Sequence, residues 1–219
     1  ALRQLAALNI GTLLQPVTRP TTVPKRAAVK AVVGSEDGLT VTSIQPLINP
    51  ALIGYLEQRC IPLEIARDYV QEMHYTRQGK PYFALAFAND SGGYELRNPY
   101  FKGTHSVKDI TLVKRKGDTG SVALFEGFMD MLSALIAYAD DLKDTSLLVL
   151  NSVALKDKAL AAIRAMGART VQLFPDHDAS GRELVAWFME QLPGMDVVDQ
   201  SGRYAGHKDV NAWLVAQQH

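Results

Sequence analysis

The chain has 219 residues, 47% of them hydrophobic, which is enough to fill the core of one large domain or two small ones. Lys plus Arg and Asp plus Glu are equal at 23 each, so no global basic excess indicates nucleic-acid binding, and any such contact depends on a local patch. A single cysteine, Cys60, excludes an internal disulfide framework and a multi-cysteine zinc site, and it fits a reducing, cytoplasmic setting.

The first 120 residues predict a linker followed by a small α+β unit. Apolar periodicity over residues 3–15 predicts a helix, and three prolines between residues 16 and 24 predict a tether, so we assign 1–45 to a helix and linker. Short helices are expected from about residue 50 and from Pro62. Two apolar runs separated by Asn89-Asp90-Ser91-Gly92-Gly93 predict a hairpin, and a further strand is expected at 110–113. These elements define a subdomain over 46–120.

Beyond Gly120 the pattern becomes regular. A short apolar run followed by an amphipathic helical pattern occurs three times, and a fourth run completes the series; the runs begin at Val122, Leu147, Thr170 and Met195. Continuously apolar strands separated by amphipathic helices are typical of a parallel sheet covered on both faces. We therefore predict a three-layer α/β domain with a mainly parallel sheet over 121–219.

Three acidic residues fall where strands of this sheet end. Glu126 follows the first strand, and Asp176 and Asp178 follow the third. Ligands gather at the carboxyl ends of such strands, and carboxylates brought together there repel one another unless a hard cation such as Mg²⁺ or Mn²⁺ is present. The alternative is structural, because Asp at these positions also caps the following helix and Glu126 could be an ordinary loop residue.

The segments Phe125-Glu126-Gly127-Phe128-Met129-Asp130 and Asp176-His177-Asp178-Ala179-Ser180-Gly181-Arg182 resemble, in order and spacing, the Toprim signature of bacterial-type primases. The resemblance implies that Glu126, Asp176 and Asp178 are metal and catalytic positions and that Asp130 is a further metal candidate, although Asp130 could equally pair with a helix dipole. Gly206-His207-Lys208-Asp209-Val210-Asn211 is similar to the Lys-Asp-x-Asn element of primase-like Toprim proteins. The similarity implies that Lys208 neutralises phosphate charge and that Asp209 adds to the acidic site. The alternative is that this segment is only a polar turn before the last helix.

Residues 82–110 resemble the small subdomain that precedes Toprim in primase cores, where basic residues hold template and nucleotide. By this resemblance Arg97, Lys102 and Lys108 are candidates for that role. Residues 50–219 as a whole resemble primase-like proteins of mobile elements of Bacteroidetes, which often carry a zinc-ribbon domain upstream. One cysteine and five histidines cannot supply that domain, so two interpretations stay open: the sequence is a fragment of a protein that carries the zinc domain upstream, or template recognition differs from that of cellular primases.

The expected function is primase-like nucleotidyl transfer on single-stranded DNA with nucleoside triphosphates, and a replicative helicase is a further candidate partner. Two alternatives stay open: a Toprim nuclease that cleaves phosphodiesters, and a non-catalytic nucleic-acid-binding module. A topoisomerase is disfavoured because 219 residues leave no space for a strand-passage domain. No run approaches the roughly 18 to 20 apolar residues of a membrane span, so no membrane contact is expected.

Overall fold

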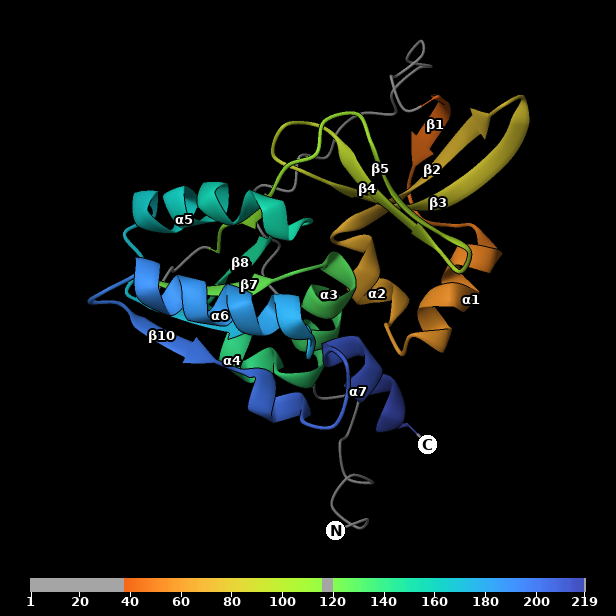
Figure 1. The fold of residues 1–219 in the computed structure, drawn as a ribbon. Coiled ribbons are helices and arrows are strands. Elements are labelled where there is room, and N and C mark those ends of the chain that lie inside the picture. Colours follow the sequence, from red (N-terminus) through yellow and green to blue (C-terminus); the bar gives the residue numbers. More distant parts are fainter. Residues whose placement is uncertain (1–37, 116–119, 219) are drawn as a thin grey trace.

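The computed structural model describes residues 38–115 and 120–218 (Figure 1). The helix expected over 3–15, the proline-rich tether and most of the turn expected at 116–120 lie outside these residues. The described chain contains two five-stranded sheets, one on each side of residue 106. None of the helices in this part of the chain is long and apolar enough to span a membrane.

The first sheet is antiparallel, with its five strands in chain order. They are β1 (Leu39–Gln45), β2 (Val70–Arg77), β3 (Lys80–Ala88), β4 (Tyr94–Asn98) and β5 (Phe101–His105). The predicted hairpin is confirmed as β3 and β4, which pair antiparallel. The sequence pattern placed residues 39–45 in the linker, whereas the structure places them in β1. Buried Leu39 and Val41 flank exposed Thr40 in this strand. The register with β2 shifts between Val41 and Ser43.

Two short helices follow β1 and pack beneath this sheet (Figure 1). Helix α1 (Pro50–Gln58) begins where expected, because the Asn49 side chain accepts a hydrogen bond from Ala51 N and proline suits the first helical position. Helix α2 (Leu63–Arg67) follows Pro62 directly. Their apolar side chains contact Leu85 and Phe87 of β3, which fixes one face of the sheet against the helices.

The second sheet is mainly parallel, in the order β10-β9-β7-β8-β6. Strands β7 (Ser121–Phe125), β8 (Ser146–Val149), β9 (Thr170–Phe174) and β10 (Asp196–Asp199) run parallel, and the edge strand β6 (Thr111–Val113) pairs antiparallel with β8. The helices are α3 (Phe128–Ala137), α4 (Ala139–Leu142), α5 (Lys156–Ala165), α6 (Ala179–Gln191) and α7 (Val210–Ala216).

Strand β7 shows why this sheet needs helices on both faces. Val122 and Leu124 pack into the core that holds α5 and α6, whereas Ala123 and Phe125 pack into the core that holds α3 and α7. All four side chains are fully buried, as in the interior of a doubly covered parallel sheet. The predicted three-layer α/β domain with a mainly parallel sheet, preceded by a small α+β unit, is confirmed.

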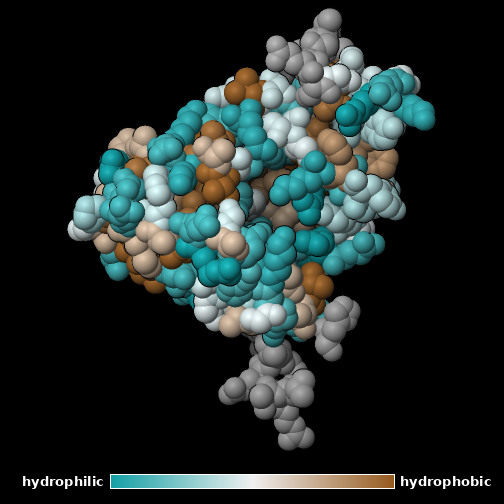
Figure 2. All heavy atoms as spheres, in the orientation of Figure 1, coloured by the Kyte–Doolittle hydropathy of each residue, from teal (hydrophilic) through white to brown (hydrophobic). Residues whose placement is uncertain are grey.

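The two sheets share one hydrophobic core. Phe87 of β3 stacks on Phe128 of α3 with ring centroids 5.0 Å apart, and Arg115 donates a hydrogen bond to the Tyr69 hydroxyl. The helical unit is also tied to the second sheet, since Asn211 of α7 donates to the carbonyl of Arg59 at the end of α1. Figure 2 shows a hollow between the part of the molecule that contains the first sheet and the part that contains the second, and its rim is largely hydrophilic.

Candidate acidic site

Glu126 and Asp176 lie side by side at the carboxyl edge of the second sheet. Strands β7 and β9 are parallel neighbours with Phe125 opposite Phe174, so the residues that follow both strands emerge together. The backbone N–H of Asp176 donates a 2.9 Å hydrogen bond to Oε1 of Glu126. This contact joins positions 50 residues apart in the chain and fixes the Glu126 carboxylate beside the loop after β9.

Asp178 has a structural role as well as a place at this edge. It is the N-cap of α6, where its Oδ1 accepts a 3.0 Å hydrogen bond from the N–H of Gly181. Its side chain is exposed, and its charge acts on both Glu126 and Asp176. The capping alternative therefore holds for Asp178, but a capping carboxylate keeps a second oxygen that is free to face a ligand.

The site concentrates negative charge that the protein only partly neutralises. Burial is the main cause that raises the pKa of Glu126, and the charges of Asp176 and Asp178 add to it, while the Asp176 N–H and Lys102 oppose it. Burial likewise raises the pKa of Asp176, with Asp209 and Asp178 adding to the shift and Lys208 opposing it. Neighbouring carboxylates whose pKa values are raised by burial and by one another are typical of sites that bind a cation or a proton.

Asp130 and Asp209 form a second acidic layer behind these residues. Asp130 lies in the first turn of α3 and its Oδ1 accepts from the N–H of Asn211 at 3.3 Å. Burial, together with the charges of Asp209 and Asp176, raises the pKa of Asp130 to about 7. Asp209 caps α7 by accepting a 2.6 Å hydrogen bond from Ala212 N, so it is a helix cap that also contributes to the field of the site.

The donor set suits a hard divalent cation. The carboxylates at the edge offer only oxygen, and their mutual repulsion is what a cation would remove. Within residues 38–115 and 120–218, no three acidic, His or Cys side chains lie close enough together to hold a metal ion by themselves. Mg²⁺ does not need one, because it commonly keeps several waters and binds through one or two carboxylates and substrate phosphates.

The predicted basic residues separate into two groups. Lys208 Nζ lies 3.6 Å from Oδ2 of Asp176, with the lysine side chain 67% exposed. The charge of Lys102 in β5 has a smaller effect and lowers the pKa of both Glu126 and Glu95. Lys108 instead pairs with Glu95 at 3.3 Å, and Arg97 donates to the Tyr55 hydroxyl at 3.2 Å. The structure thus places Lys208 beside Asp176, leaves Lys102 to act on the site through its charge, and gives Lys108 and Arg97 other partners.

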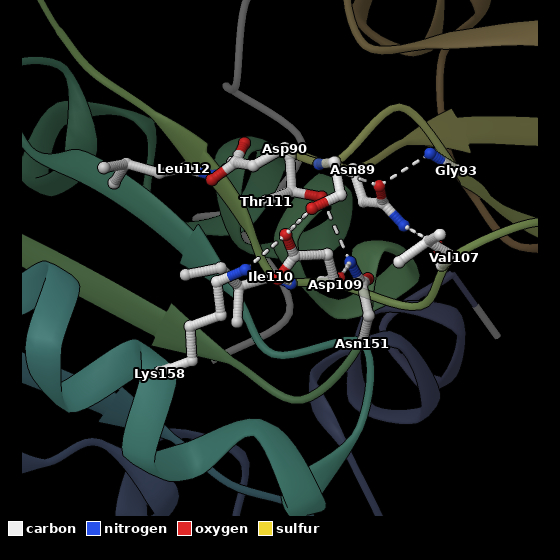
Figure 3. Close-up of polar contacts among 11 residues, drawn as sticks. Asn89, Asp90, Gly93, Val107, Asp109, Ile110, Thr111, Leu112, Asn151 and Lys158 are labelled. Carbon is white, nitrogen blue, oxygen red and sulfur yellow. Dashed lines mark hydrogen bonds and ion pairs between the residues drawn. The ribbon is translucent and has the colours of Figure 1, made fainter.

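A polar junction that sequence reasoning missed supports the Glu126 loop (Figure 3). Asn151, just after β8, has a positive φ of 61° and its N–H donates to the carbonyl of Glu126 at 3.1 Å. Its side-chain amide donates to the carbonyl of Asp109 at 2.8 Å and to Thr111 Oγ1 at 3.0 Å. The sole signal for this role in the sequence was that Asn is one of the few residues that tolerate this backbone conformation.

The buried carboxylate of Asp109 anchors this junction. It accepts hydrogen bonds from Lys158 Nζ at 2.6 Å, from the Ser91 hydroxyl and from Ile110 N–H at 2.8 Å. Burial alone would raise the pKa of Asp109, but the hydrogen bonds from Lys158, Ser91 and Ile110 outweigh it and lower the pKa. The ionised form is therefore the one that the fold stabilises.

Asp109→Asn is expected to lower the free energy of unfolding by about 2 kcal/mol at pH 7, because Lys158 and Ser91 lose a charged acceptor. Since the folded pKa lies below the unfolded one, this contribution is present above pH 4 and declines as pH falls through the folded pKa. Urea unfolding of both proteins at pH 7 and pH 3 measures it. A stability difference that does not shrink at the lower pH would contradict this account.

Comparison with protein families places two domains on the chain. Residues 123–214 match the Toprim-like family. The parallel strands of the second sheet and the helices between them therefore form a Toprim-like domain. Residues 41–106, which hold the antiparallel sheet with α1 and α2, match a domain of unknown function, DUF8464. A search of curated proteins found no significant match.

Solved structures support the same fold for the Toprim-like domain and its neighbour together. The primase fragment of the bacteriophage T7 primase-helicase matches with a TM-score of 0.55 and 20% identity, covering 89% of this chain and 78% of that one. A chain of the complex in which T7 lagging-strand DNA polymerase interacts with primase domains bound to an RNA/DNA hybrid and dTTP matches with a TM-score of 0.56 and 19% identity, covering 80% and 92%. At this identity the likeness establishes a primase-like fold.

Proposed function

We propose that this protein is a metal-dependent, primase-type nucleotidyltransferase that synthesises oligonucleotides on single-stranded DNA from nucleoside triphosphates. The observation that carries the proposal is the pairing of Glu126 with Asp176 at the edge of a Toprim-like domain, held by the Asp176 N–H and faced by Lys102 and Lys208. The proteins with the same fold include a primase fragment and primase domains bound to an RNA/DNA hybrid and dTTP.

Each residue has a defined part in this proposal. Glu126, Asp176 and Asp178 would hold one or two Mg²⁺ or Mn²⁺ ions, with Asp130 and Asp209 behind them. When bound, such an ion supplies Lewis-acid activation of the attacking hydroxyl and charge neutralisation at the phosphate. Lys208, exposed beside Asp176, is placed to offset charge on the leaving pyrophosphate as the 3′-oxygen forms its bond to the α-phosphorus.

Lys102 would contribute on the opposite side of the site. It belongs to β5 of the antiparallel sheet, and its charge lowers the pKa of Glu126. A cation in that position attracts the phosphates of template or incoming nucleotide and holds them against the acidic edge. Lys108 and Arg97, which have partners elsewhere, would then act on the nucleic acid further from the reacting atoms.

The proposal is tested by following the DNA template and any newly synthesised oligonucleotide in the same reaction. The protein is incubated with labelled single-stranded DNA, differently labelled nucleoside triphosphates and Mg²⁺ or Mn²⁺, and the products are resolved on a denaturing gel. New labelled oligonucleotides with an intact template are expected. Shortened template without new strands would replace the proposal with Toprim nuclease activity, and no change in either strand would replace it with a nucleic-acid-binding module.

A further inference from the structure

The antiparallel sheet carries exposed aromatic rings. In the described part of the chain, the large hydrophobic side chains that reach solvent include three aromatic ones: Tyr82 at 42%, Phe83 at 37% and Tyr100 at 97% exposure. Tyr82 and Phe83 belong to β3, and Tyr100 lies in the turn between β4 and β5. Because Tyr82 and Phe83 are consecutive in a strand, their rings lie on opposite faces of the sheet, so Tyr100 can share a surface with only one of them.

The turn that carries Tyr100 is fixed by Asn98. The side-chain Oδ1 of Asn98 accepts a 2.9 Å hydrogen bond from Tyr100 N–H, and its Nδ2 donates a 2.8 Å bond to the carbonyl of Phe83. One side chain thus ties the turn to β3 at the position of Phe83. The backbone that carries Tyr100 is therefore fixed, so a ligand that stacks on the ring has to order only the Tyr100 side chain.

The charge that this sheet shows to solvent is positive. The acidic residues within β2 to β5 are Glu72 and Glu95, and both are buried: Glu72 accepts from the N–H groups of Ile48 and Asn49, and Glu95 accepts from Thr104 and Lys108. The exposed charged residues of these strands are basic, namely Arg77, Lys80 and Lys102. Exposed aromatic rings among exposed cations are typical of surfaces that bind single-stranded nucleic acid.

We propose that Tyr100, with Phe83 beside it, is a base-stacking platform for single-stranded DNA, and that Lys102 guides the phosphates from this platform to the Glu126 site. Lys102 follows Tyr100 by two residues at the start of β5, so the cation that would receive the phosphates lies directly beside the turn that carries the ring. The proposal rests on the proposed function for its ligand, which is the template strand. It adds a contact to bases, where the acidic site and the lysines contact only phosphates.

Base removal provides the test. Binding to a fluorescent oligothymidylate and to an abasic oligonucleotide of equal length is measured by anisotropy without nucleotides or catalysis. Tyr100→Ala is expected to weaken binding to oligothymidylate by about 5-fold or more and to leave binding to the abasic strand unchanged. Tyr100→Phe should retain wild-type affinity, and Met189→Ala, which removes a side chain 47% exposed on α6, is the matched control and should change nothing. Lys102→Ala should weaken binding to both strands.

Tyr100 is almost fully exposed, so its loss should leave the fold intact, and a thermal melt of the variant confirms this. Equal weakening on both strands, or no weakening on either, would overturn the proposal; the second result is also what a protein-docking role for Tyr100 would give. The outcome is separable from that of the proposed function. Tyr100-dependent binding by a protein that synthesises no oligonucleotide would support the platform while rejecting nucleotidyl transfer.

Discussion

Asp176→Asn is expected to reduce nucleotidyl transfer by about 100-fold or more, because it removes the charge of a carboxylate at the centre of the acidic edge. The same variant should be at least as stable as the wild type at pH 7. Burial and the charges of Asp209 and Asp178 raise the pKa of Asp176, and a carboxyl group whose folded pKa is raised destabilises the fold when ionised. A neutral amide relieves that repulsion.

Product formation and thermal unfolding, measured on the same preparation, check both halves of this prediction. Loss of activity together with loss of stability would mean that Asp176 is mainly structural. Retained activity would remove Asp176 from the chemistry altogether. The combination that we expect, an inactive and equally or more stable protein, is typical of a site that is kept strained for function.

Gly181→Ala is expected to lower the free energy of unfolding by about 2 kcal/mol or more and to abolish activity. A Cβ at this position would lie 2.0 Å from the carbonyl oxygen of Asp176 and about 3 Å from two further atoms of the Asp176 backbone. The obstacle is backbone, so no flexible side chain can yield. The loop after β9 would have to shift, and with it the Asp176 N–H that holds Glu126.

Gly54→Ala in α1 is the matched control for this substitution. A Cβ there would meet nothing within 4 Å, and alanine favours a helix, so the variant should be as stable as the wild type or up to about 1 kcal/mol more stable. Chemical denaturation and the nucleotidyl-transfer assay separate the two variants. Wild-type activity in Gly181→Ala would show that the close approach of α6 to Asp176 does not set the geometry of the site.

The Toprim-like sheet could be predicted from sequence because its strands are buried on both faces. Runs such as Val122 to Phe125 are too short for helices, and they alternate with longer segments of clear apolar helical periodicity, which together favour buried parallel strands. Strands β2 and β5 gave no such signal. Strand β2 buries Glu72 among its apolar residues, and β5 has only Phe101 as a large apolar side chain, so their strand character depends on pairing with neighbours.

The acidic edge was predictable for the same reason: residues after adjacent parallel strands emerge together, so the positions of Glu126 and Asp176 follow from the strand pattern. The supporting contacts were not. Asn151 reaches Asp109 across 42 residues and Lys158 reaches Asp109 across 49, and no local pattern encodes such pairs. The same applies to Lys102, which could be predicted as basic and solvated but not as the lysine that faces Glu126.

The most direct test of the central claim is strand synthesis by the Glu126→Gln variant beside the wild type. Glutamine keeps an oxygen that can accept from the Asp176 N–H, so the fold should persist while the charge is lost. Glu183→Gln, which neutralises an exposed glutamate on α6, is the matched control. We predict new oligonucleotides from the wild type and Glu183→Gln and none from Glu126→Gln; synthesis by a folded Glu126→Gln protein at the wild-type rate would contradict the account.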